Sequence, residues 1–129
     1  MTHDELTRRA EIWLRGTMRC NVVLVEPRAR IKEGPDAIGW RHNCSILVEC
    51  KTSRSDFLRD QKKPFRRKPQ YGMGNFRYYM TVPGILLPGD LPDHWGLVEV
   101  RKSRVYVVKK APRLRNVTGM LGNERIMLV

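Results

Sequence analysis

Two carboxylates and a lysine near the middle of the chain have the types and spacing needed for metal-dependent hydrolysis. Asp36 follows a proline, and Glu49 and Lys51 stand one residue apart at the end of an apolar run. The carboxylates and the backbone carbonyl of Cys50 offer the hard oxygen ligands that Mg²⁺ takes. A metal held there would activate a water and neutralise charge on a phosphate, while Lys51 would stabilise the transition state or position that water. The residues therefore predict phosphate-ester hydrolysis, with Mg²⁺ or Mn²⁺ as the cofactor.

The apolar run predicts the strand that carries Glu49 and Lys51. In an extended strand over 44–51, alternate side chains point to opposite faces. Glu49 and Lys51 then share one face with Leu47, and the other face is apolar, with Ile46, Val48 and Cys50. A second strand over 37–41 leads into this one through a tight turn. Antiparallel pairing of the two strands would bring Asp36 and Glu49 to the same end of the sheet.

The pattern resembles the PD-(D/E)XK nuclease superfamily, in which an aspartate, a spacer and Glu-x-Lys mark the end of a central strand. Here Pro35-Asp36, twelve intervening residues and Glu49-Cys50-Lys51 fill these positions. A wider resemblance, over about 22–108, is to the MmcB-like DNA-repair proteins and small phage proteins of the same fold. The segments that carry it are Ser53 to Leu58, Arg77 to Tyr79 with Val82-Pro83, Leu91-Pro92, and Trp95 to Leu97.

This resemblance implies an α/β fold with a restriction-endonuclease-like core, a central mixed β-sheet flanked by helices. It also implies a DNA endonuclease of repair, recombination or phage DNA processing. In similar nucleases an acidic residue of the first helix faces the metal, which here would be Glu11. A polar residue of the helix after the Glu-x-Lys strand often assists, and Gln61 is the nearest candidate, with a solvated glutamine that has no role at the site as the favoured alternative. Glu11 has a second interpretation, a surface ion pair with Arg8 or Arg15 at helical spacing.

Capping residues and hydrophobic periodicity predict the remaining elements. Thr2 and Glu5 form a capping box for a first helix, and Ser53 or Ser55 can cap a second helix that Pro64 stops. Further strands are expected over 21–26, 76–82, 96–101 and 104–110. The pattern predicts the secondary structure of residues 111–129 least clearly, with a short helix expected over 116–127. The pattern predicts a single domain over residues 1–129.

The charge of the chain predicts a polyanionic partner. Lys and Arg number 25 against 13 Asp and Glu, a net charge of +12, which suits nucleic acid, most simply DNA. The basic stretch over 62–71 could follow a phosphate backbone while the ring of Tyr71 stacks on a base. The alternative is a solvated charge run. The candidate contacts are Lys62, Lys63, Arg66, Arg67, Lys68, Tyr71 and, beyond the stretch, Arg77.

Other classes of protein fit the sequence poorly. No apolar stretch is long enough to cross a bilayer and the N-terminal residues do not begin a signal peptide, so we expect a cytoplasmic protein with no membrane partner. Cys20, Cys44 and Cys50 lack the spacing of a zinc ribbon or a disulfide framework. A homodimer would suit two coordinated cuts in a duplex.

Two functions are therefore open at this point. The first is a divalent-metal-dependent endonuclease that uses Asp36, Glu49 and Lys51. The second is a non-catalytic nucleic-acid-binding protein in which the same three residues form a structural ion-pair cluster, with Asp36 in a turn after Pro35.

Overall fold

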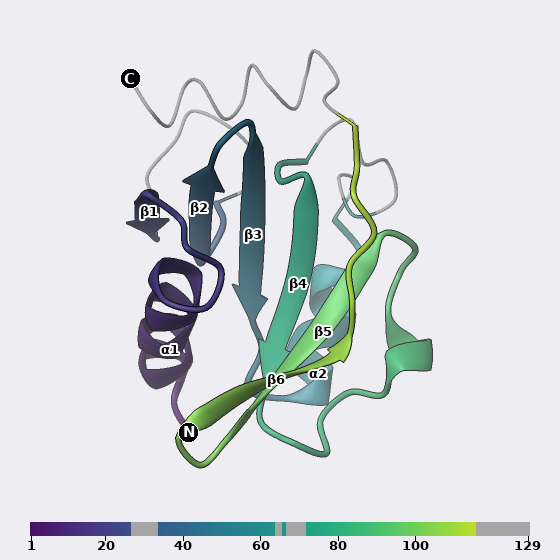
Figure 1. Ribbon diagram of the computed structural model, residues 1–129. Coiled ribbons are helices and arrows are strands. Elements are labelled where there is room, and N and C mark those ends of the chain that lie inside the picture. Colours follow the sequence, from purple (N-terminus) through teal and green to yellow (C-terminus); the bar gives the residue numbers. More distant parts are fainter. Residues whose placement is uncertain (27–33, 64–65, 67–71, 116–129) are drawn as a thin grey trace.

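The computed structural model describes residues 1–26, 34–63, 66 and 72–115. Within them the chain forms a six-stranded sheet with helices on both faces (Figure 1). This confirms the expected α/β class with a mixed sheet flanked by helices. The elements in chain order are α1 His3–Arg15, β1 Val22–Val25, β2 Ala37–Arg41, β3 Cys44–Cys50, α2 Arg54–Asp60, β4 Phe76–Thr81, the 3-10 helix η2 Pro88–Asp90, β5 Trp95–Arg101 and β6 Arg104–Lys109.

The order of the strands in the sheet follows their order in the chain, from β1 to β6. β1, β2 and β3 pair antiparallel, β3, β4 and β5 pair parallel, and β6 returns antiparallel to β5. The parallel pairing of β3 with β4 needs a crossover, and α2 lies in it. In the β2–β3 hairpin Ala37 pairs with Val48. Asp36 therefore lies at the end of the sheet where β3 finishes, and the hairpin turn lies at the opposite end.

Helix α1 begins as the sequence predicts. Thr2 is the N-cap and shares a reciprocal capping box with Glu5, and Gly16 is the C-cap. The apolar stripe of α1 packs on one face of the sheet, and this core includes Trp13, whose ring meets that of Tyr78 edge-on at 5.4 Å. Burial of such a stripe supplies most of the stability of a helix in a small domain.

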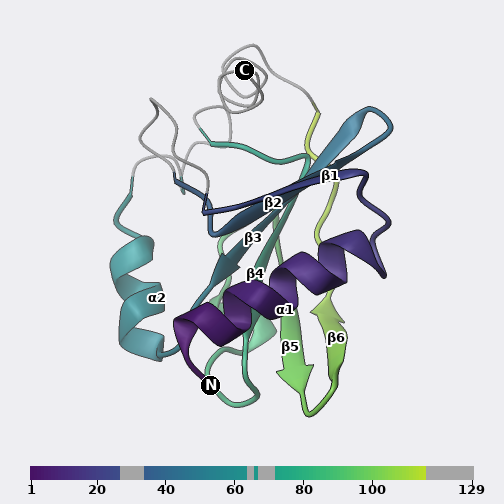
Figure 2. The same ribbon diagram turned by 90° about the vertical axis from the view of Figure 1, so that its left-hand side faces the viewer.

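Helix α2 covers the other face of the sheet, as Figure 2 shows. Ser53 is its N-cap, and Phe57 reaches a second core beside Tyr79. Tyr79 stacks on Trp95 with ring centroids 4.3 Å apart, and Trp95 is buried in this second core. The two cores divide the side chains of β3 alternately, because Leu47 belongs to the α2 face and Val48 to the α1 face.

The segment after β6 is tied back to the start of β3 and β4. The backbone amide of Leu114 donates to the carbonyl of Asn75 over 2.7 Å, and the Asn75 amide donates to the carbonyl of Leu114 over 2.9 Å. Asn75 also accepts from the amide of Ser45. Gly96 permits this path, since a Cβ there would lie 2.6 Å from the backbone nitrogen of Ala111. Residues 111–115 are therefore fixed against the sheet.

The predicted element boundaries agree with the structure to within a residue or two, apart from the second helix, which ends at Asp60, several residues before Pro64. The helix expected over 116–127 lies outside the described residues. None of the helices in the described ranges has the length and apolar character needed to cross a bilayer.

Candidate active site and metal-binding residues

The side chains of Glu49 and Lys51 lie together in a buried ionic cluster on the α2 face. Lys51 Nζ is 3.9 Å from Glu49 Oε2 and 3.4 Å from Asp60 Oδ1. Glu49, Lys51 and Asp60 are only 3%, 7% and 2% exposed. The alternation of β3 and the last turn of α2 position these groups, because α2 crosses the face on which every second residue of β3 points.

Arg66 and Tyr79 complete this arrangement, and we call the five residues the closed cluster: Glu49, Lys51, Asp60, Arg66 and Tyr79. Arg66 binds Asp60 in a bidentate manner, with Nε 2.6 Å from Oδ2 and Nη2 3.1 Å from Oδ1. Its Nη2 also lies 3.6 Å from Glu49 Oε1. The Tyr79 hydroxyl donates to Asp60 Oδ2 and accepts from Gln61 Nε2. The predicted assistant residue Gln61 therefore supports the tyrosine.

The closed cluster holds Asp60 as a carboxylate. Burial raises the pKa of this carboxyl group, but the hydrogen bonds and charge of Arg66, with the Tyr79 hydroxyl and the charge of Lys51, outweigh burial and hold the pKa well below its usual range. Burial has the larger effect on Tyr79 and raises the pKa of its phenol. Two carboxylates face two buried cations here, which is the balance that burial of charge requires.

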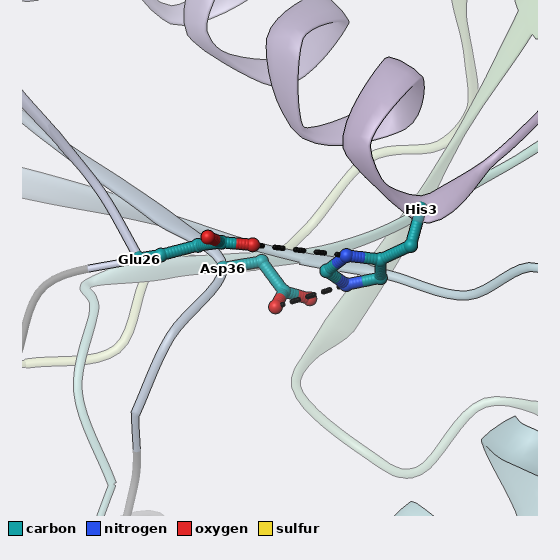
Figure 3. A group of neighbouring side chains, drawn as sticks. All are labelled: His3, Glu26 and Asp36. Carbon is teal, nitrogen blue, oxygen red and sulfur yellow. Dashed lines mark ion pairs between the residues drawn. The ribbon is translucent and has the colours of Figure 1, made fainter.

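A second group of ionisable residues lies at the ends of β1 and β2, and we call it the open cluster: His3, Glu26 and Asp36 (Figure 3). His3 Nε2 is 3.2 Å from Asp36 Oδ1, and His3 Nδ1 is 3.7 Å from Glu26 Oε1. The first turn of α1 carries the histidine, while the carboxylates come from the residues just after β1 and just before β2. The backbone amide of Glu26 donates to the Asp36 carbonyl over 2.8 Å, which fixes the two segments side by side.

Asp36 connects the two clusters through the backbone. Its Oδ2 accepts from the Cys50 amide over 2.8 Å, and Cys50 lies between Glu49 and Lys51. The Cys50 thiol is buried on the α1 face, and burial, followed by the nearby charge of Asp36, raises its pKa. Burial therefore favours the protonated thiol, and the predicted metal ligand of this residue is its backbone carbonyl, not its side chain.

The structure divides the predicted metal ligands between the two clusters. The group of described residues with side-chain ligand atoms within 4.8 Å of one another contains Asp36 but not Glu49, and the expected backbone carbonyl ligand of Cys50 stays a prediction. Its ligands are two carboxylates and an imidazole. Carboxylates suit Mg²⁺ and Mn²⁺, and imidazole suits transition metals, so this set fits Mn²⁺ better than Mg²⁺. His3 was not among the predicted ligands, and its place at the start of a capped helix is the signal in the sequence that points to it.

Glu11 forms a surface ion pair with Arg15, which is the second of its two interpretations. Its Oε2 lies 3.3 Å from Arg15 Nη2 across one turn of α1, in a pair exposed to solvent. The expectation that Glu11 faces the metal is therefore corrected, because His3 is the α1 residue whose side chain reaches Asp36.

Comparisons with known proteins establish the fold and nothing further. No protein-family model matches the chain, and no curated protein does either. A solved structure, the SPO1766 protein of unknown function from Silicibacter pomeroyi, is similar with a TM-score of 0.69. The match covers 99% of this chain and 85% of that chain at 18% sequence identity.

The predicted nucleic-acid contacts fall into three groups. Lys62 and Lys63 are exposed at the end of α2, and Lys63 Nζ lies 3.1 Å from Asp60. Arg66 belongs to the closed cluster, and Arg77 is 1% exposed with its Nε donating to the Gly74 carbonyl. These two arginines therefore stabilise the interior and do not face solvent. The others, Arg67, Lys68 and Tyr71, lie outside the described residues.

Proposed function

We propose that this protein is a divalent-metal-dependent DNA endonuclease that hydrolyses phosphodiesters. The observation that carries the proposal is the hydrogen bond from the Cys50 amide to Asp36. It holds the carboxylate of Asp36 at the strand end that also carries Glu49 and Lys51, so the three residues of the Asp and Glu-x-Lys pattern meet at one end of the sheet, although Asp36 and Glu49 belong to different clusters. A net charge of +12 favours a polyanionic substrate such as DNA. The proposal also places the protein in the cytoplasm, where it would bind this DNA.

His3, Glu26 and Asp36 would hold the metal, preferably Mn²⁺, on the basis of their ligand types and spacing. A divalent ion bound there supplies an activated water and neutralises charge on the phosphate. Asp36 is oriented for this role by the Cys50 amide. Glu49 and Asp60 hold the Lys51 ammonium at the end of β3, and the proposal gives Lys51 the task of stabilising the phosphate in the transition state.

A plasmid-nicking assay tests the proposal. Purified protein should convert supercoiled DNA to the nicked form with Mn²⁺, more slowly with Mg²⁺, and should stop with chelator. Asp36→Asn keeps an oxygen for the Cys50 amide but removes the charge, and Lys51→Met keeps much of the volume of the side chain. Each should lower the rate about 100-fold or more, with DNA affinity unchanged.

Glu11→Gln is the matched control, because it removes a carboxylate from a surface pair with Arg15 and leaves both clusters intact. Its nicking rate should equal that of the unmodified protein. Nicking that persists at full rate in Asp36→Asn and Lys51→Met would locate the activity elsewhere, or in a contaminant.

A second candidate function is non-catalytic nucleic-acid binding. The burial of Glu49 and Lys51 with Asp60 and Arg66 favours it, since a closed ion network of this kind can be structural alone. In that case no metal supports nicking, and Lys51→Met changes stability without changing DNA affinity. The same assay with a thermal melt distinguishes the two functions.

A further inference from the structure

A basic pocket lies at the opposite end of the sheet from both clusters. It has a volume of about 470 Å³ and opens around the β2–β3 turn. Three arginines contribute to its wall, and each comes from a different segment of the chain. The lining residues are Arg19, Arg41, His42, Asn43, Cys44 and Arg113.

Contacts to the backbone position two of the three arginines near the pocket. Arg41 Nη1 donates to the Met18 carbonyl over 2.9 Å, which orients the guanidinium. Arg113 precedes Leu114, whose backbone is bonded to Asn75. Within the described part of the chain, no carboxylate forms an ion pair with Arg19, Arg41 or Arg113.

The chemistry of this wall suits a phosphate group. A guanidinium presents five N–H donors in a planar fork that matches phosphate oxygens, and the field of three such groups with no acid among the lining residues favours an anion. His42 and Asn43 add side chains that can donate hydrogen bonds. The volume lies within the range of pockets that bind small molecules, so a phosphate could enter with part of the sugar to which it is bonded.

We infer that this pocket binds a phosphate group of a nucleic-acid strand. The binding of phosphate rests on the pocket alone, and the identity of the strand as substrate rests on the proposed function. Cys44 lines the pocket and Cys50 donates to Asp36, and the six residue steps of β3 between them span about 20 Å. One DNA strand carries a phosphate about every 3.4 Å along the duplex axis. The pocket would hold the backbone about six nucleotides from the bond that is cut.

Substitution of Arg19 tests this inference without a cost in folding. Its backbone has φ of 56°, a left-handed conformation that glycine adopts without strain. Arg19→Gly therefore removes a guanidinium from the pocket while it relieves backbone strain, so weaker binding cannot be assigned to unfolding. Lys102 has φ of 53° in the β5–β6 turn, away from the pocket lining. Lys102→Gly makes the same change in charge and backbone and is the matched control.

The first measurement is the anisotropy of a labelled 12-nucleotide DNA strand in chelator, where no cleavage occurs, over a range of salt concentration. Arg19→Gly should lower the magnitude of the slope of log affinity against log salt by about 0.7, the value for one lost phosphate contact with a single strand. Lys102→Gly should leave the slope unchanged. Equal slopes for Arg19→Gly and the unmodified protein would overturn the inference.

The second measurement identifies the source of the phosphate. Inorganic phosphate and the 12-nucleotide strand are titrated separately while the backbone amide resonances of residues 41–44 are followed. Shifts with both ligands, absent in Arg19→Gly, support a nucleic-acid phosphate site. Shifts with inorganic phosphate alone would mean a small phosphate compound and overturn the inference, as would no shift with either. A failed nicking assay leaves these results unaffected, and a failed titration leaves the nicking assay unaffected.

Discussion

The two clusters at the end of β3 use similar ionisable groups in opposite surroundings. The closed cluster is buried, with each carboxylate facing a cation, whereas the open cluster has side chains that are 41%, 55% and 17% exposed for His3, Glu26 and Asp36. Buried charges depend on their partners, because removal of one partner leaves the other without solvation. Exposed charges exchange partners at little cost, since water and salt screen them. The closed cluster is therefore suited to fix Lys51, and the open cluster is suited to accept a ligand.

The largest expected effect comes from breaking the closed cluster. Asp60→Asn leaves Arg66 and Lys51 buried without their main carboxylate, so we expect the free energy of unfolding to fall by about 3–5 kcal/mol. Urea denaturation followed by circular dichroism measures it. Asp56→Asn is the control on the same helix, where the carboxylate makes an exposed pair with Arg59, and it should cost less than about 1 kcal/mol. Similar losses of unfolding free energy in Asp60→Asn and Asp56→Asn would show that burial does not determine how much each carboxylate contributes to stability.

A metal should stabilise the open cluster by a smaller amount. Mn²⁺ at 100 times its dissociation constant would add about 2.7 kcal/mol to the free energy of unfolding, and a thermal melt with and without Mn²⁺ detects it. His3→Gln should abolish the added stability and, without metal, melt within a degree or two of the unmodified protein. Glu11→Gln should respond to Mn²⁺ normally. An undiminished metal response in His3→Gln would exclude the open cluster as the binding site.

Acid should weaken the closed cluster gradually. The pKa of Asp60 is held below the ordinary value of 3.8 in the folded protein, so the unfolded chain binds its proton first as the pH falls. The stability from this group is therefore complete above about pH 4 and is lost as the pH falls toward the folded pKa, by at most about 1.4 kcal/mol per pH unit. Urea denaturation at pH 3 and pH 6 measures the free energy of unfolding, which should fall more between pH 6 and pH 3 in the unmodified protein than in Asp60→Asn. Parallel losses in the two proteins would assign the acid sensitivity to other groups.

Local patterns explain why much of the fold was predictable. Alternation and turn residues determined β2 and β3, and the capping box of Thr2 and Glu5 determined the start of α1. The same patterns correctly placed Asp36 at the end of the sheet where β3 finishes. The partners of each charge were less predictable, because His3 meets Asp36 and Arg66 meets Glu49 through the packing of helices and loops on the sheet. No spacing in the sequence encodes those contacts.

The hydrogen bonds between Asn75 and Leu114 bear on the order in which the open cluster and the basic pocket can form during synthesis. The three members of the open cluster lie within the first 36 residues, whereas the lining of the basic pocket includes Arg113, which precedes the Leu114 that is bonded to Asn75. A nascent chain released before residue 113 would lack one wall of the pocket even if its sheet had formed. Phosphate binding, if the pocket has the inferred function, would thus depend on a late segment of the chain that the proposed metal site does not contain.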